Sequence, residues 1–239
     1  MLNDTKTDRI RYIAFDLWNT LAYSLPRDPL IDLAEILGIV SQDIYSLQRL
    51  LLTREFASSN SFFEICSLLN VSYCHQKKNK FYELIERERK LFNLFSDSLP
   101  VLKLAKEQKF RVILASNLWN FCLPVLNEKI FYNFTFDYIF YSFKVGHIKP
   151  DNFFFKAFES AKIKVSEVIF VGDSLGADVL GSMHAGAKAI WLRRECSSEA
   201  FQIEENYLLQ SDSYLGSANN LYQSLDIIQS YSQSSDEIN

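Results

Sequence analysis

The chain contains 239 residues, enough for one sizeable domain or for a domain that carries a small insert. A hydrophobic content of 48% is that of a globular protein, and a net charge of −4 excludes general affinity for nucleic acid, since no basic excess neutralises phosphates. No apolar run approaches the roughly 20 residues of a membrane span, and residues 1–12 lack the apolar segment of a secretion signal.

The cysteines indicate neither a disulfide framework nor a zinc site. They are dispersed, without a Cys-x-x-Cys pair: Cys66, Cys74, Cys122 and Cys196. Cys66, Cys74 and the adjacent His75 lack a fourth ligand at sensible spacing. Free thiols are the rule in a reducing cytosol. We therefore predict a cytoplasmic protein whose partner is a small molecule, neither nucleic acid nor a membrane, and the sequence indicates no oligomeric state.

A short apolar strand is predicted over residues 10–16, after a polar start. It ends at the carboxylate of Asp16, and Asn19 and Thr20 follow in a tight turn. Ligands of open α/β sheets bind at the edge where strands end, and an unpaired buried charge is costly. Asp16 is therefore either a turn or helix-capping residue or a reactive or ligand-binding carboxylate, and this stretch alone does not separate the two interpretations.

Residues 30–94 show only helical periodicity. Apolar residues recur every three or four positions in residues 31–40, 41–56, 59–70 and 77–95. We predict a small bundle of about four helices inserted after the first strand. Its charged residues are mixed in sign, which is typical of a solvated helix face.

From residue 97 onward, helices and strands alternate. Strands are predicted at 110–116, 136–142, 168–173 and 187–192, with helices at 99–108, 118–130, 151–162 and 174–186. Pro124 permits only an early helix position or a kink. This alternation indicates βαβ units and a parallel sheet. An edge strand near Tyr214, a helix from residue 218 to 228 and a disordered tail at 230–239 complete the prediction.

Polar residues follow three of the predicted strands at one edge of the sheet: Asp16, Ser116 with Asn117, and Asp173. Lys149 precedes a predicted helix, and Asp178 follows Asp173 by five residues. Converging carboxylates repel one another unless a divalent cation joins them, and oxygen ligands suit Mg²⁺, which also binds substrate phosphate. A phosphate between Mg²⁺, Lys149 and the Ser116 hydroxyl would be well neutralised.

Four motifs, in this order across nearly the whole chain, resemble those of the haloacid dehalogenase-like hydrolase superfamily: FDLWNTL (15–21), ILASN (113–117), HIKPD (147–151) and FVGDSLGAD (170–178). The resemblance implies an α/β fold, with a Rossmann-like parallel-sheet core and an inserted helical cap. The core would comprise residues 1–22 and 96–229, and the cap residues 23–95. The cap would close over the site and select the substrate.

The resemblance also implies roles for the polar residues. Asp16 would be the nucleophile and form an aspartyl-enzyme intermediate. The phosphoryl or leaving group would be bound by Ser116, Asn117 and Lys149. Mg²⁺ would be bound by Asp16, Asp173 and the backbone carbonyl of Trp18. Thr20 would steady the turn, and Asp178 would support the loop or the lysine.

Trp18 departs from the pattern of the superfamily's phosphatases, which carry a second aspartate there to protonate the leaving group. General acid–base catalysis is worth about 10²–10⁴ in rate. The dehalogenases of the superfamily have an aromatic residue at this position, because a halide leaves without a proton. The resemblance implies, however, that dehalogenases work without metal and lack a carboxylate at the position of Asp173.

Three functions remain open on the sequence. The first is a Mg²⁺-dependent phosphohydrolase acting on a small phosphorylated metabolite through Asp16, which Asp173 favours. The second is a 2-haloacid dehalogenase, which Trp18 favours. The third is a catalytically impaired protein that binds a phosphate ligand or a partner, which the missing acid favours.

Further residues have both a functional and a structural interpretation. Tyr23 and Asp28 could replace the missing acid, although both are also typical of a turn. Arg49 and Arg54 could bind a substrate carboxylate or lie exposed on a helix. Trp119 could form a wall of the pocket or be a core residue at a helix start, and His147 could face the site or only its loop. His184 is interpreted as a surface or packing residue.

Overall fold

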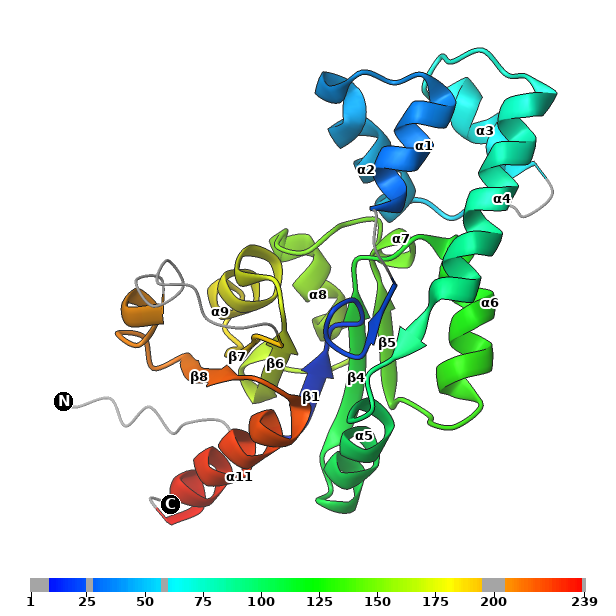
Figure 1. The fold of residues 1–239 in the computed structure, drawn as a ribbon. Coiled ribbons are helices and arrows are strands. Elements are labelled where there is room, and N and C mark those ends of the chain that lie inside the picture. Colours follow the sequence, from blue (N-terminus) through cyan, green and yellow to red (C-terminus); the bar gives the residue numbers. More distant parts are fainter. Residues whose placement is uncertain (1–8, 25–27, 57–59, 195–204, 238–239) are drawn as a thin grey trace.

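The computed structural model describes residues 9–24, 28–56, 60–194 and 205–237 (Figure 1). Its centre is a six-stranded sheet in the order β5-β4-β1-β6-β7-β8, and every neighbouring pair is parallel. Its strands are β1 (Tyr12–Phe15), β4 (Arg111–Ser116), β5 (Tyr138–Tyr141), β6 (Val168–Gly172), β7 (Lys188–Leu192) and β8 (Tyr214–Ala218). The predicted fold class, a Rossmann-like parallel sheet with inserted helices, is confirmed.

Helices cover both faces of the sheet, because side chains of a strand point alternately to its two sides. Ile13 and Phe15 of β1 belong to one apolar cluster, which includes residues of α5 (Ser98–Glu107) and α11 (Leu221–Glu237). Tyr12 and Ala14 belong to a second cluster with α8 (Asn152–Ser160). Strand β1 is consequently buried along its whole length, and the residue that follows it has a rigid support.

Strand β1 lies at the point where the chain changes direction across the sheet. The chain runs outward from β1 to β4 and β5, and later builds β6, β7 and β8 on the other side of β1. The loops after the two neighbours of β1 therefore diverge, and a ligand crevice forms at such a switch point. Asp16 follows β1 directly.

The inserted helices form a unit with an apolar core of its own. They are α1 (Pro29–Leu37), the 3₁₀ turn η1 (Ser41–Asp43), α2 (Ile44–Thr53), α3 (Ser61–Leu68) and α4 (His75–Leu91). Their buried faces supply Leu33, Leu47, Phe62 and Phe81 to one cluster, against which Trp119 and Phe121 of the sheet domain also pack. Figure 1 places the unit beyond the end of β1.

A two-stranded antiparallel ribbon connects this unit to the sheet domain. It pairs β2 (Ala22–Tyr23) with β3 (Asn93–Leu94). The prediction of a helix through residue 95 is wrong at this point, because α4 ends at Leu91. Phe92 takes up an extended conformation (φ −65°, ψ 122°) and its buried ring joins the core cluster under the sheet.

The segment predicted as one helix at 118–130 is divided in three. It contains the 3₁₀ turn η2 (Asn120–Cys122), α6 (Leu123–Leu126) with Pro124 in its first turn, and the π-helix η3 (Asn127–Phe131). The remaining elements are α7 (Ser142–Val145), the 3₁₀ turn η4 (Val165–Glu167), the π-helix η5 (Leu175–Leu180) and α9 (Gly181–His184). Asp151 caps α8 by accepting a hydrogen bond from the amide of Phe153 (2.9 Å).

The end of the chain differs from its prediction. α11 continues to Glu237, so residues 230–237 are helical rather than disordered. The hydroxyls of Ser230 and Ser234 each donate to a backbone carbonyl four residues earlier, a local bond that serine can make within a helix. None of the helices in the described ranges combines the length and apolar character that crossing a membrane requires.

Candidate active site at the carboxyl edge of the sheet

Asp16 begins a tight loop that leaves the end of β1. Its amide donates to the carbonyl of Val171 on β6 (3.0 Å), which continues the pairing of β1 one residue past the strand. The amides of Leu21 and Ala22 both donate to the carbonyl of Leu17 (2.8 Å each), which closes the loop. Asn19 adopts the left-handed region (φ 53°), which asparagine tolerates better than most residues. The Asp16 carboxylate is thereby held in a nearly buried position at the sheet edge.

Lys149 is the cation of the site, and its side chain is almost entirely buried (2% exposed). Its ammonium Nζ donates to Oδ1 of Asp16 (2.6 Å), to Oδ1 of Asp178 (2.6 Å) and to the carbonyl of Ala115 (2.8 Å). All three ammonium donors are thus satisfied. Burial disfavours the charge, but the carboxylates of Asp16 and Asp178 outweigh it and raise the pKa of Lys149 above its ordinary value.

Asn117 fixes the backbone of Lys149 from the end of β4. Its Nδ2 donates to the Lys149 carbonyl (3.0 Å), and its Oδ1 accepts the Lys149 amide (2.9 Å). This reciprocal pair ties the loop after β4 to the loop before α8. The peptide bond between Lys149 and Pro150 is cis. Asn117 therefore positions Lys149, in addition to placing its own side-chain amide at the site.

Ser116 ends β4 with a completely buried hydroxyl. Its Oγ has no hydrogen-bond partner within the part of the chain that the structure describes. An unpaired buried hydroxyl is unfavourable by about 1–3 kcal/mol, so such a group commonly awaits a ligand or a water molecule. The adjacent carbonyl, that of Ala115, is bound by Lys149, so this free hydroxyl lies next to the charged cluster.

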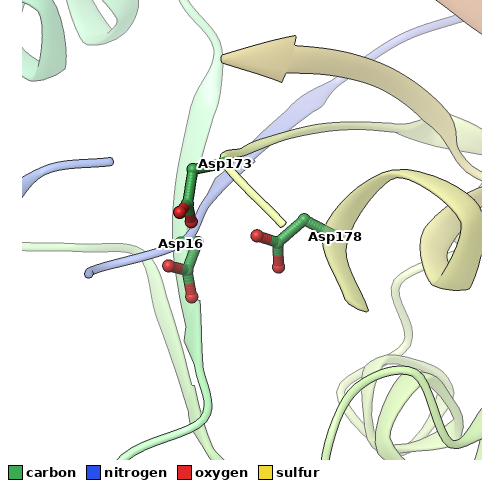
Figure 2. Close-up of side chains that lie close together, drawn as sticks. All are labelled: Asp16, Asp173 and Asp178. Carbon is green, nitrogen blue, oxygen red and sulfur yellow. The ribbon is translucent and has the colours of Figure 1, made fainter. Parts of the chain in front are cut away.

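Three carboxylates converge at the carboxyl edge of the sheet, those of Asp16, Asp173 and Asp178. Each offers one oxygen within 4.8 Å of the others (Figure 2). Asp173 accepts a hydrogen bond from Nδ2 of Asn19 (3.2 Å). Burial and the negative charge of Asp16 raise the pKa of Asp173 to about 6. Asp178 is already engaged, because its oxygens accept from Lys149 and from the amide of Ser174 (3.0 Å).

This donor set fits a divalent cation that prefers oxygen. Asp16 and Asp173 present carboxylate oxygens close together, and the raised pKa of Asp173 indicates a local deficit of positive charge. Hard cations such as Mg²⁺ bind one or two carboxylates and retain several waters. Asp178 would then support Lys149 and the loop after β6, as its hydrogen bonds indicate.

Thr20 and the loop around it are held by residues that the sequence did not single out. The hydroxyl of Thr20 is buried with no hydrogen-bond partner among the described residues. Its carbonyl accepts from Nη2 (2.6 Å) and Nε (3.1 Å) of Arg194, whose guanidinium also binds both oxygens of Asp97 (2.9 and 3.1 Å). Arg194 and Thr20 are 174 positions apart, so no local sequence pattern could have connected them.

Trp18 is half-buried and packs edge to face against Phe92, with ring centroids 5.5 Å apart. Of the two replacements considered for the missing acid, Tyr23 packs on Phe95 and Asp28 caps α1 by accepting the amide of Leu30 (2.9 Å). Asp28 also lies on the wall of the cavity described below, whereas Tyr23 does not.

Four further candidates do not line the cavity described below. His147 binds the carboxylate of Asp151 (3.0 Å) and stacks on Phe153, and His184 ends α9. Arg49 and Arg54 are exposed on α2 and at its C-terminal cap. The described cysteines are free thiols, as predicted, and Cys196 lies outside the described residues.

A cavity of about 520 Å³ lies between the sheet edge and the helical unit. Its apolar lining consists of Trp18, Pro29, Leu30, Leu52, Ile85, Phe92, Trp119, Phe121, Cys122 and Val125. Its polar lining consists of Asn19, Ser24, Asp28, Gln48, Glu88, Arg89 and Asn117. Ile85 and Phe92 were not predicted from the sequence, and Glu88 and Arg89 were interpreted there as part of a solvated helix face, although the spacing of three and four residues from Ile85 places them on one face of α4.

The chain is similar to known proteins, both in its sequence family and in its fold. Residues 38–192 match a family model described as haloacid dehalogenase-like hydrolase. That range contains Ser116, Lys149 and Asp173 and begins after Asp16. No curated protein matches the sequence.

Solved structures share the fold over most of their length. A HAD phosphatase from Thermococcus onnurineus is 20% identical with a TM-score of 0.58, covering 92% of this chain and 98% of its own. A 2-haloacid dehalogenase from Pseudomonas syringae pv. Tomato DC3000 is 20% identical with a TM-score of 0.60, covering 93% and 99%. The HAD-family enzyme BT-2542 from Bacteroides thetaiotaomicron, in complex with magnesium and inorganic phosphate, is 16% identical with a TM-score of 0.55, covering 80% and 98%.

Proposed function

The chain belongs to the haloacid dehalogenase-like hydrolase family, and from this premise we propose that it is a Mg²⁺-dependent phosphohydrolase acting on a small phosphorylated metabolite. The observation that carries the proposal is the carboxylate of Asp173 beside that of Asp16. Two carboxylates this close repel one another unless a cation joins them. The carboxylate of Asp173 is therefore compatible with a nucleophilic Asp16 when a metal ion neutralises its charge.

Asp16 is the proposed nucleophile, and its environment selects one of its two oxygens. Lys149 binds Oδ1, so Oδ2 is the oxygen that attacks phosphorus and forms an aspartyl phosphate. The leaving oxygen departs with the electron pair of the broken P–O bond. Water then hydrolyses the aspartyl phosphate and releases inorganic phosphate. The free hydroxyl of Ser116 and the amide of Asn117 lie beside this centre to bind phosphoryl oxygens.

Asp16, Asp173 and the backbone carbonyl of Trp18 are the groups that would hold Mg²⁺. When bound, the ion neutralises the carboxylates and polarises the phosphoryl oxygens. Asp178 keeps Lys149 in place, and Thr20 lies buried within the loop that carries the nucleophile. Residues 23–95 act as the cap, since the cavity lies between their helices and the sheet edge.

The test is hydrolysis of an aryl phosphate with Mg²⁺ and with a chelator, for the wild-type protein and for Asp16→Asn. We expect metal-dependent release of phosphate that Asp16→Asn abolishes. Absence of metal-dependent release by the wild-type protein, or full release by Asp16→Asn, contradicts the proposal. Asp43→Asn is the matched control, because Asp43 is exposed at the start of α2, makes no capping hydrogen bond through its side chain and does not line the cavity.

A 2-haloacid dehalogenase is the second candidate, and Trp18 is the observation that favours it. Release of chloride from 2-chloropropionate in the presence of a chelator, lost in Asp16→Asn, would establish this activity in place of the first. A third candidate is a binding protein with little catalysis, favoured by the same residue. It predicts that the wild-type protein binds inorganic phosphate with Mg²⁺ but hydrolyses no phosphate ester.

A further inference from the structure

The cavity next to the site has an aromatic wall that suits a flat, apolar group. The rings of Trp18, Phe92, Trp119 and Phe121 line it, together with the aliphatic side chains of α2 and α4. Its volume of about 520 Å³ falls within the range of small-molecule sites, roughly 300–1,000 Å³. Aromatic walls bind planar rings by stacked or edge-to-face contacts.

The same cavity borders the proposed reaction centre at two asparagines. Asn19 lines the cavity and donates to the carboxylate of Asp173. Asn117 also lines it, next to Ser116, and holds the backbone of Lys149. A phosphoryl group bound at Asp16 would therefore direct its ester substituent into the aromatic cavity.

No carboxyl group of the cavity is free to protonate a leaving oxygen. Position 18 is tryptophan, and Asp28 is committed to the N-cap of α1. Both carboxylate oxygens of Glu88 are engaged, because Oε2 accepts from the hydroxyl of Ser24 (3.2 Å) and Oε1 accepts from Arg87 (2.9 and 3.2 Å). The leaving oxygen must then depart as an anion, which a phenol (pKa about 10) does far more easily than an alcohol, whose acidity is close to that of water.

We infer that the substrate is a monophosphate ester of a phenol-type hydroxyl, with an uncharged aromatic body seated in this cavity. The inference rests on the proposed function. The P–O bond to the aryl oxygen breaks, its electron pair leaves with the phenolate, and the new bond joins phosphorus to Oδ2 of Asp16. Water completes the hydrolysis, and the phenolate takes its proton from solvent. The carboxylates of Asp28 and Glu88 disfavour a second anionic group, and Arg89 is already paired with Glu86 (2.6 Å).

Phenyl phosphate and benzyl phosphate provide a matched test, because they share one ring and differ in the leaving oxygen. We expect KM values within a few-fold of each other and a kcat for phenyl phosphate larger by about 10² or more, the size of missing general-acid catalysis. Glycerol phosphate, which has no ring, should have a higher KM than either. Comparable kcat values for phenyl and benzyl phosphate would overturn the inference and leave the proposed function intact. If the protein hydrolyses none of the three with Mg²⁺, the proposed function itself is wrong.

The cavity wall is tested by Phe121→Ala, which should raise the KM for phenyl phosphate about fivefold while changing kcat little, since an aromatic contact contributes about 1 kcal/mol. Phe121→Leu keeps an apolar side chain there and should restore much of the affinity and any lost folding. Phe63→Ala is the control, because Phe63 on α3 is 60% exposed and does not line the cavity. An unchanged KM in folded Phe121→Ala would contradict the placement of the ring.

Discussion

Gly172 is the last residue of β6, and its missing side chain makes room for the carboxylate of Asp178. A Cβ at this position would collide with the carboxyl group and Cβ of Asp178. That carboxylate holds Lys149, so the displacement would reach the ammonium that binds Asp16. The site therefore depends on a residue that carries no functional group.

We predict that Gly172→Ala lowers the rate of phosphate-ester hydrolysis by about 10² or more and the free energy of unfolding by about 1–3 kcal/mol. Gly176→Ala is the matched control, because a Cβ there meets no atom within 4 Å and the change should be neutral. Activity assays and urea unfolding of both variants provide the measurement. Equal activity of the two variants would show that the Gly172 contact does not hold the site.

The carboxyl group of Asp173 would make the proposed metal binding dependent on pH. Its pKa is raised to about 6 by burial and by the charge of Asp16, so it takes up a proton as the pH falls through 6. A protonated carboxyl does not bind a metal ion. We expect the apparent affinity for Mg²⁺ to be about tenfold weaker at pH 5 than at pH 7, measured by calorimetry. An affinity that stays constant over this interval would mean that Asp173 is not a ligand.

The ribbon of β2 and β3 is the element that joins the helical unit to the sheet domain, and Arg194 fastens it. The guanidinium binds the Thr20 carbonyl just before β2 and the Asp97 carboxylate just after β3, and it lies 3.7 Å from the ring centroid of Phe95. Asp97 also accepts the amide of Leu221 at the start of α11 (2.9 Å). The pair of Arg194 and Asp97 therefore holds together both ends of the ribbon and the start of the last helix.

We predict that Arg194→Lys lowers the free energy of unfolding by about 2–3 kcal/mol, because an ammonium cannot reproduce the planar fork on two acceptors. Arg11→Lys is the control: the Arg11 side chain is 63% exposed and lies 3.7 Å from Glu167, so the solvent-exposed cation makes this a pair worth at most about 1 kcal/mol. Urea denaturation of both variants measures the difference. A loss for Arg194→Lys no larger than that for Arg11→Lys would contradict the role of the clamp.

Helices and strands with a clear hydrophobic periodicity could be predicted from the sequence. Very short elements, and contacts between residues far apart in the sequence, could not. The buried strands that end at Asp16, Ser116 and Asp173 are marked by apolar runs followed by a polar residue, and the structure has β1, β4 and β6 there. β2 and β3 have two residues each, too few for any period. α11 was predicted too short because its last residues are serine-rich, and their hydrogen bonds to the preceding turn are not visible in a hydrophobic pattern.

At the scale of the molecule, the candidate site exists only when the whole sheet is folded. Asp16 follows β1, Ser116 ends β4, Lys149 precedes α8 and Asp173 follows β6. The sequence could place these residues at one edge because parallel strands end together. It could not predict the aromatic cavity, which requires the helical unit, the ribbon and the segment after β4 to meet. A ligand of the site therefore binds the folded chain and not the unfolded one.

We expect Mg²⁺ at 100 times its dissociation constant to stabilise the protein by about 2.7 kcal/mol, which raises the melting temperature by roughly 5–10 °C for a chain of this size. The measurement is thermal unfolding in MgCl₂ against NaCl of equal ionic strength. Asp173→Asn should lose the magnesium-dependent increase while keeping the response to NaCl. Because binding at any exposed acidic surface would stabilise both proteins alike, an equal increase in the variant would locate the bound ion outside the cluster of Asp16 and Asp173.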